Sequence, residues 1–288
     1  MISITSINYL LKSKFNNLYI KDIKVLSSKG EYITCLINDD YIFHIILNPK
    51  QNIDYSKEKE NLSFLRKQLD TSLSIPDITY LYISDDIVIK GYKQIEGIPL
   101  NTNIIRLMNI DDQDILAKDI ANFLKKLHSL LKYDKCNYKE VIKNDISLIK
   151  EYIYDLLSSE EKDYVSNLES NLERDINIHE CLSHNALSYS RLIINRDNKL
   201  VGIVGFDQLD LGPNYIDFIP LLEDDEFAKK IINYYSDINY EDLISYKNIM
   251  DLYYPISIIA YGIKNNRNDI IERGRRLISE KQKTIQYE

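Results

Sequence analysis

The stretch that decides the fold runs from Cys181 to Phe218 and reads CLSHNALSYSRLIINRDNKLVGIVGFDQLDLGPNYIDF. Two short apolar runs lie inside it, Leu192–Ile194 and Leu200–Val204, and the polar residues Arg196-Asp197-Asn198 separate them. Short apolar runs on either side of a turn rich in Asp and Asn are typical of a strand, a turn and a second strand. We therefore expect a hairpin here, with a polar loop before it and another after it.

The order of residues in this stretch resembles the catalytic segment of the aminoglycoside phosphotransferases, and most closely the branch that acts on a 2''-hydroxyl. That family writes its catalytic loop as His, then Gly or Asn, then Asp, with an Asn or His five residues further on and Ile-Ile-Asp-Phe-Gly-Asp on the next strand. His184-Asn185 matches the start of this pattern. The resemblance implies that the catalytic carboxylate, the amide-type metal ligand and the metal-binding carboxylate correspond here to Ala186, Arg191 and Gly205.

Three further segments carry the same resemblance in the same order. Lys93–Leu100 is similar to the linker after the adenine-binding hinge, Ala117–Ser129 to the first large C-lobe helix, and Leu222–Glu226 to an acidic stretch after the metal-site strand. The resemblance implies an α+β, bilobal, protein-kinase-like fold. Residues 1–95 would form the N-lobe, with a five-stranded sheet and one helix, and residues 96–288 a larger, mainly helical C-lobe that carries the remnant of the catalytic loop.

The hydrophobic periodicity predicts elements of the same kind. Apolar residues that recur at intervals of three and four predict helices, and short apolar runs bounded by turn residues predict strands. We expect strands at 20–26, 32–37, 41–47, 78–83 and 87–92, and helices at 2–15, 56–69, 111–131, 147–157, 160–172, 226–235, 240–254 and 269–281.

Composition narrows the class of protein. A chain of 288 residues with 44% hydrophobic residues can bury a core, and no apolar run approaches the length of a membrane span. The N-terminus lacks the features of a signal peptide, so we expect a cytoplasmic protein. Three scattered cysteines predict neither a disulfide framework nor a zinc site. The net charge of −8 disfavours nucleic acid as a partner and is compatible with a cationic ligand.

Four changed positions, His44, Ala186, Arg191 and Gly205, fall on the chemistry, and the resemblance therefore implies that no catalytic group is intact. Arg191 would either repel magnesium or use its guanidinium to bind a phosphate or a neighbouring carboxylate; a solvent-facing arginine is the third interpretation. Asp207 is an alternative metal ligand, but two residues along a strand displace it from position 205 by about 6 to 7 Å. His184 and Asp217 correspond to residues that brace the catalytic loop in the family.

The resemblance also assigns the nucleotide site. His44 stands where the family has a phosphate-gripping Lys, and Glu60 stands where the family has the Glu that pairs with that Lys. A histidine is shorter than a lysine and mostly neutral near pH 7. Lys93, Gln94 and Ile95 correspond to the hinge that contacts the adenine.

The acidic stretch formed by Glu223, Asp224, Asp225 and Glu226 corresponds to the site where the family binds the amino groups of its drug. The alternative is an acidic helix start, which the helix dipole favours.

We predict a pseudokinase with a binding or regulatory role, whose partner is a cationic small molecule or a protein. No cofactor is expected, and metal-independent binding of ATP or GTP stays open. One alternative is an active small-molecule phosphotransferase, with ATP or GTP and magnesium at a rearranged metal site. The other is a ligand-free scaffold.

Overall fold

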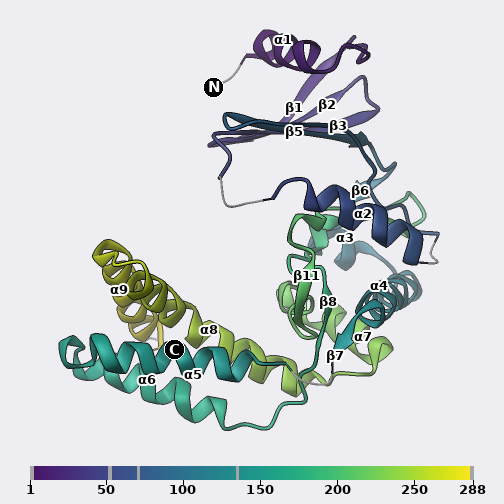
Figure 1. Cartoon of the computed structure of the whole chain (residues 1–288). Helices are drawn as coiled ribbons and strands as arrows, with labels where there is room; N and C mark the ends of the chain where they lie inside the picture. Colours follow the sequence, from purple (N-terminus) through teal and green to yellow (C-terminus); the bar gives the residue numbers. More distant parts are fainter. Residues whose placement is uncertain (1–2, 51–53, 70–71, 134–135, 286–288) are drawn as a thin grey trace.

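The computed structural model describes residues 3–50, 54–69, 72–133 and 136–285, so Ile2, the first residue of the predicted N-terminal helix, lies outside the described residues (Figure 1). The N-terminal part is an antiparallel sheet of five strands in the order β1-β2-β3-β5-β4. Helix α1 covers its outer face and helix α2 lies beneath it. The elements are α1 (Ile4–Lys14), β1 (Ile23–Lys29), β2 (Tyr32–Ile37), β3 (Tyr41–Leu47), α2 (Lys57–Gln68), β4 (Ile78–Ile83) and β5 (Ile87–Lys93).

The two faces of this sheet have different roles. Side chains alternate along a strand, so every second residue points to the same side. On one side Ile33, Cys35 and Phe43 pack with Ile7 and Leu11 of α1 in a small core of their own. The other side faces α2 and the rest of the molecule, and it carries polar side chains that are central to the site.

The larger C-terminal part is mainly helical and carries two small sheets, ordered β10-β9-β6 and β11-β8-β7. In Figure 1, α5, α6, α8 and α9 form a group set apart from α4 and α7. The elements are β6 (Ile98–Pro99), α3 (Thr102–Leu107), α4 (Ile110–Leu130), β7 (Lys132–Tyr133), α5 (Tyr138–Tyr152), α6 (Ser159–Leu172), β8 (Glu180–Ser183), β9 (Leu192–Ile194), β10 (Leu200–Ile203), β11 (Asp210–Pro213), α7 (Asp225–Tyr235), α8 (Tyr240–Lys264) and α9 (Asn268–Ile285); 3₁₀ turns cover Tyr154–Leu156, Tyr189–Arg191, Phe206–Gln208 and Ile219–Glu223.

The bilobal α+β fold and the N-terminal sheet predicted from sequence are confirmed, but several bounds differ: β1 lies three residues later than expected, α9 ends four residues later, and α5 and α8 differ most. Helix α5 begins at Tyr138 and ends at Tyr152, because Ile142, Ile146 and Ile149 form a buried stripe that starts well before residue 147. Helix α8 continues past Pro255, where we expected it to end.

A specific contact lets α8 continue through its proline. Pro255 has no N–H to offer to the carbonyl of Asp251, four residues earlier. The ammonium group of Lys281 on α9 donates to that carbonyl oxygen instead. The neighbouring helices approach closely enough that a Cβ atom on Gly274 would lie 2.9 Å from the carbonyl oxygen of Pro255.

In the described part of the chain, no helix has both the length and the apolar character needed to cross a bilayer.

Candidate functional site

The loop between β8 and β9 is held by one buried carboxylate. Asp217 is fully buried and accepts the backbone N–H groups of His184 and Asn185, each at 2.8 Å. Its Oδ2 atom also lies 3.1 Å from Nε2 of His128. Burial is the largest single effect and opposes the charged form of His128, but the interactions with Asp217 and Cys181 together outweigh it and raise the pKa of His128 to about 9. The backbone of the loop is therefore fixed by an ionic contact within the core.

The ring of His184 fixes the loop to the chain just after β10. Its Nε2 atom lies 3.1 Å from the carbonyl oxygen of Val204, and its ring centroid lies 4.6 Å from that of Phe206. Burial lowers the pKa of His184, which favours a neutral ring that donates this hydrogen bond. The structure thus brings His184 and Asp217 together at the loop, where both act on its shape.

Arg191 lies against Gly205, and these are two of the three positions where the family would bind metal or orient its acceptor. Its Nη1 atom donates to the carbonyl oxygen of Gly205 at 2.5 Å and lies 3.6 Å from Oδ1 of Asp207. Gly205 has a φ of +82°, and a Cβ atom there would lie 2.9 Å from Nε of Arg191. The guanidinium therefore occupies the space next to position 205 that a carboxylate side chain would need.

These residues do not fit a magnesium ion. Magnesium requires oxygen ligands at about 2.0 to 2.1 Å in near-octahedral geometry. Here Gly205 offers no side chain, Arg191 brings a positive charge, and Asp207 already faces that charge. Among the described residues, no group of three or more His, Cys, Asp and Glu side chains is arranged to hold a metal ion.

The position that we matched to the family's catalytic carboxylate carries no acid–base group, because Ala186 offers only a methyl group. Its neighbour Asn185 has a left-handed backbone, with φ of 61°. The side-chain amide of Asn185 donates to the carbonyl oxygens of Asp210 at 3.0 Å and Gln208 at 3.2 Å. Asn185 therefore ties the chain between Phe206 and β11 to the loop.

His44 projects from β3 towards the interior face of the sheet. Its Nδ1 atom lies 3.0 Å from Oγ1 of Thr34, and its Nε2 atom lies 3.1 Å from the hydroxyl of Tyr92. Burial and the nearby Lys90 ammonium lower the pKa of His44 to about 4. The ring is therefore neutral at pH 7 and supplies no charge for a phosphate group.

On this face of the sheet, the positive charge is carried by Lys90 of the neighbouring strand β5. Lys90 on β5 lies directly opposite His44 in the sheet register, and its ammonium group pairs with the carboxylate of Glu58 on α2. Both side chains are largely buried, with exposed fractions of 10% for Lys90 and 15% for Glu58. Glu60, which we expected to face the sheet, is exposed.

Helix geometry explains why Glu58 faces the sheet. Glu58 precedes the buried Leu62 by four residues and Leu65 by seven, so the three share one face of α2, whereas Glu60 lies almost opposite. The sequence contained a signal for Lys90 as well, because it is the one charged residue of the run Ile87–Tyr92.

Lys93, Gln94 and Ile95, the residues that we matched to the adenine-binding hinge, lie at a second location, apart from the group around His44 and Lys90. The backbone N–H of Gln94 donates to the carbonyl oxygen of Asp40 at 2.7 Å, and the exposed Lys93 lies 3.9 Å from the Asp40 carboxylate. Together with Ile95, these residues line a cavity of about 1030 Å³ that also borders Ser74–Asp77 and Ile194–Asp197.

The acidic stretch starts helix α7, and three of its four carboxylates have partners. Asp224 caps the helix by accepting the N–H of Phe227, and it also accepts a hydrogen bond from Arg106. Asp225 and Glu226 both pair with Lys229, at 2.8 and 2.9 Å. Glu223 is exposed at the end of the preceding 3₁₀ turn. These contacts match the interpretation of an acidic helix start.

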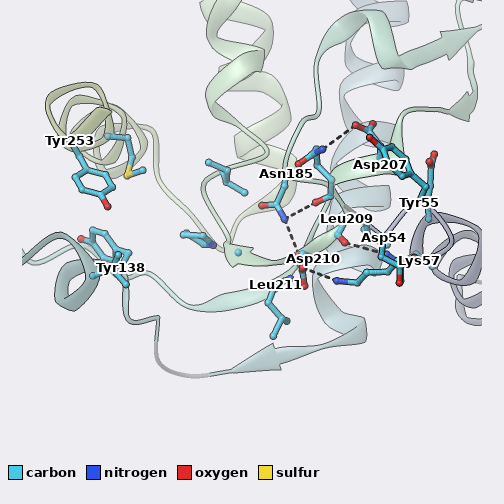
Figure 2. Close-up of a pocket in the computed structure, with 18 of the residues that line it drawn as sticks. Asp54, Tyr55, Lys57, Tyr138, Asn185, Asp207, Leu209, Asp210, Leu211 and Tyr253 are labelled. Atoms are coloured by element: carbon cyan, nitrogen blue, oxygen red, sulfur yellow. Dashed lines mark hydrogen bonds and ion pairs between the residues drawn. The ribbon is translucent and has the colours of Figure 1, made fainter. Parts of the chain in front are cut away.

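A cavity of about 690 Å³ lies between the N-terminal sheet with α2, strand β11, and helices α5 and α8 (Figure 2). One part of its wall is charged, and the other is formed by tyrosines and aliphatic side chains. Asn185 and Asp207 from the catalytic segment border the charged part. The charged lining residues are Asp54, Lys57, Glu58, Lys90, Asp207 and Asp210.

No protein-family model matches the chain. Solved phosphotransferase structures share its fold along nearly the whole length. The GDP complex of a mutant aminoglycoside 2'-phosphotransferase-IIIa has a TM-score of 0.72 at 20% identity, covering 98% of each chain. The gentamicin complex of APH(2'')-IIa gives 0.68 at 24% identity, covering 96% of this chain and 97% of that one. Macrolide 2'-phosphotransferase MphH from Brachybacterium faecium gives 0.66 at 11%, covering 96% and 98%. The chain thus has the kinase-like fold of these phosphotransferases.

The contact between Arg191 and Gly205 predicts a non-additive effect on stability. Gly205→Ala should lower the free energy of unfolding by about 2 kcal/mol, of which about 1 arises from the left-handed backbone and about 1 from the contact with Arg191. In an Arg191→Ala background the same substitution should cost only about 1 kcal/mol. Urea unfolding of the four proteins measures the difference. Equal costs in both backgrounds would show that Arg191 does not pack against position 205.

The buried ion pair predicts a contrast between two glutamates of one helix. Lys90→Met should destabilise the protein by about 3 to 5 kcal/mol, because it leaves Glu58 buried without its partner. Adding Glu58→Met to Lys90→Met should recover part of this loss. Glu60→Gln is the matched control and should change stability by less than about 0.5 kcal/mol. Thermal and urea unfolding test the series, and a larger effect of Glu60→Gln than of Glu58→Gln would contradict the assignment.

Proposed function

We propose that this protein uses a phosphotransferase fold to bind a ligand and does not transfer phosphate. The observation that carries the proposal is the position of Arg191, whose guanidinium lies against Gly205 and 3.6 Å from Asp207. The positive charge that a phosphotransferase would obtain from magnesium is here part of the chain and already faces a carboxylate.

The electrostatics of this arrangement oppose a rearranged metal site. A divalent cation near Arg191 would be repelled by the guanidinium, and the attraction of Asp207 for the metal would have to exceed its attraction for Arg191. The structure also offers no base at Ala186, and the amide of Asn185 is engaged with Gln208 and Asp210. An acceptor hydroxyl in this region would have no carboxylate at position 186 to orient it.

The preserved scaffold supports a role in binding. The buried contacts of Asp217 hold the loop in shape although its catalytic residue is absent. The 690 Å³ cavity has the size of a small-molecule site. Two of the similar structures hold GDP and gentamicin, respectively. We infer a small-molecule ligand of net positive charge, bound in this cavity and not at residues 223–226, where three of the four carboxylates have partners within the protein.

Turnover is the first test. Purified protein with ATP or GTP and magnesium should produce no phosphorylated kanamycin or gentamicin above background, because removing catalytic groups that act together lowers rates by several orders of magnitude. Mass spectrometry of the acceptor and release of nucleoside diphosphate measure the result. A magnesium-dependent product that disappears in Asp207→Asn would contradict the proposal and establish a rearranged site.

Magnesium dependence of nucleotide binding is the second test. A saturating ligand at a hundred times its dissociation constant stabilises a folded protein by about 2.7 kcal/mol. We expect ATP to give either no melting shift or a small one that magnesium does not increase. The variant Ala186→Asp/Arg191→His/Gly205→Asp should gain a magnesium-dependent shift, since aspartate tolerates the backbone at position 205 and Lys90 already supplies the cation. Gly205→Asp alone should not gain one, because the new carboxylate would pair with Arg191.

A further inference from the structure

The 690 Å³ cavity has two chemically different ends. Figure 2 shows Asp54, Lys57, Asp207 and Asp210 on one side of the view and Tyr138 and Tyr253 on the other. The charged end is built by the segment leading into α2, by α2 itself and by the chain around β11, whereas the tyrosines come from α5 and α8. A ligand that fills the cavity must therefore match both environments.

The charged end has an excess of negative charge. Its described lining residues include four carboxylates and two lysines, which gives a net charge of −2. Both lysines are paired, Lys90 with Glu58 and Lys57 with Asp210 at 3.0 Å. Asp54 and Asp207 are the remaining carboxylates.

Asp54 has no ion-pair partner among the described residues. Its carboxylate accepts hydrogen bonds from the hydroxyl and the backbone N–H of Ser56, and these bonds lower its pKa. It is therefore ionised at neutral pH. Asp207 lies 3.6 Å from Arg191, which is a loose ion pair, and 43% of its side chain is exposed. This end of the cavity is suited to an ammonium group and disfavours an anion.

The other end is apolar and aromatic. Tyr138 and Tyr246 pack edge to face with ring centroids 5.6 Å apart, and Val141, Met250 and Tyr253 extend the wall. Tyr246 is completely buried, and the hydroxyls of both Tyr138 and Tyr246 have no hydrogen-bond partner among the described residues. Both oxygen atoms are enclosed by the protein, so these tyrosines present ring carbons and not hydroxyls to the cavity.

We propose that the cavity binds a small amphiphilic amine, with an aromatic or alicyclic body against the tyrosines and one ammonium group near Asp54 and Asp207. This rests on the proposed binding function and specifies its ligand. An aminosugar fits less well, because its ring hydroxyls would lose water against Tyr138, Met250 and Tyr253 without enough partners. An organic anion of the same shape would meet the net negative charge. The tyrosine faces add attraction for any cationic group that approaches them.

Isothermal titration with three matched probes tests the proposal. The probes are 4-phenylbutylamine, the neutral 4-phenylbutan-1-ol and the anion 4-phenylbutyrate, with kanamycin as a polar polycation. We expect the amine to bind about tenfold more tightly than the alcohol, and the carboxylate and kanamycin to bind more weakly than the alcohol. Equal affinities of amine and alcohol, tightest binding of kanamycin, or no binding of the amine to folded protein would overturn the proposal.

Two pairs of variants locate the two ends. Asp54→Asn keeps an oxygen for Ser56 but removes the charge, so it should reduce the preference for amine over alcohol at least threefold, whereas Glu60→Gln, on the exposed side of α2, should not. Val141→Asn, at a residue that is 51% exposed, should weaken both probes, whereas Ile115→Asn, 49% exposed on α4, should weaken neither. Control variants that act as strongly as the cavity variants would place binding elsewhere. Turnover of kanamycin or gentamicin, measured separately, would overturn the proposed function and not this inference.

Discussion

The contact between Arg191 and Gly205 is the constraint on which the rest of the site depends, because the guanidinium brings a positive charge next to Gly205. It donates to the Gly205 carbonyl and faces Asp207, so it takes up both the space and part of the negative charge that a metal ion would use. The absence of a side chain at Gly205 is complementary to this arrangement, since a Cβ atom there would lie 2.9 Å from Nε of Arg191. Arg191 and Gly205 therefore fit each other as a pair.

The residues around Arg191 form a well-connected scaffold. Asp217 holds the loop through two backbone N–H groups, and His184 contacts the chain just after β10. On the sheet above, the buried pair of Lys90 and Glu58 links β5 to α2, while His44 is held as a neutral residue between Thr34 and Tyr92. These contacts preserve a defined cavity below the sheet, and a binding function requires such a cavity.

Much of the fold could be predicted from the sequence, because the alternation of β2 and β3 and the buried stripe of α4 are strong local patterns. The continuation of α8 past Pro255 could not, since it depends on Lys281 from another helix. In the site, the order of residues along the chain singled out Ala186, Arg191 and Gly205, and their roles stay predictions. The contact between Arg191 and Gly205 joins the 3₁₀ turn before β9 to the chain after β10 and has no sequence signal. Glu58 could have been found from the phase of Leu62 and Leu65, but Lys90 required the strand register.

The most direct test of the central claim is electron paramagnetic resonance of manganese, used as a paramagnetic substitute for magnesium, in the presence of ATP. The spectrum of the manganese–ATP complex broadens when a protein site contributes ligands and slows its rotation. If Arg191 occupies the metal site, the spectrum should be unchanged by an excess of this protein, and the Ala186→Asp/Arg191→His/Gly205→Asp variant should alter it. A protein-bound manganese spectrum with the unmodified chain would contradict the account.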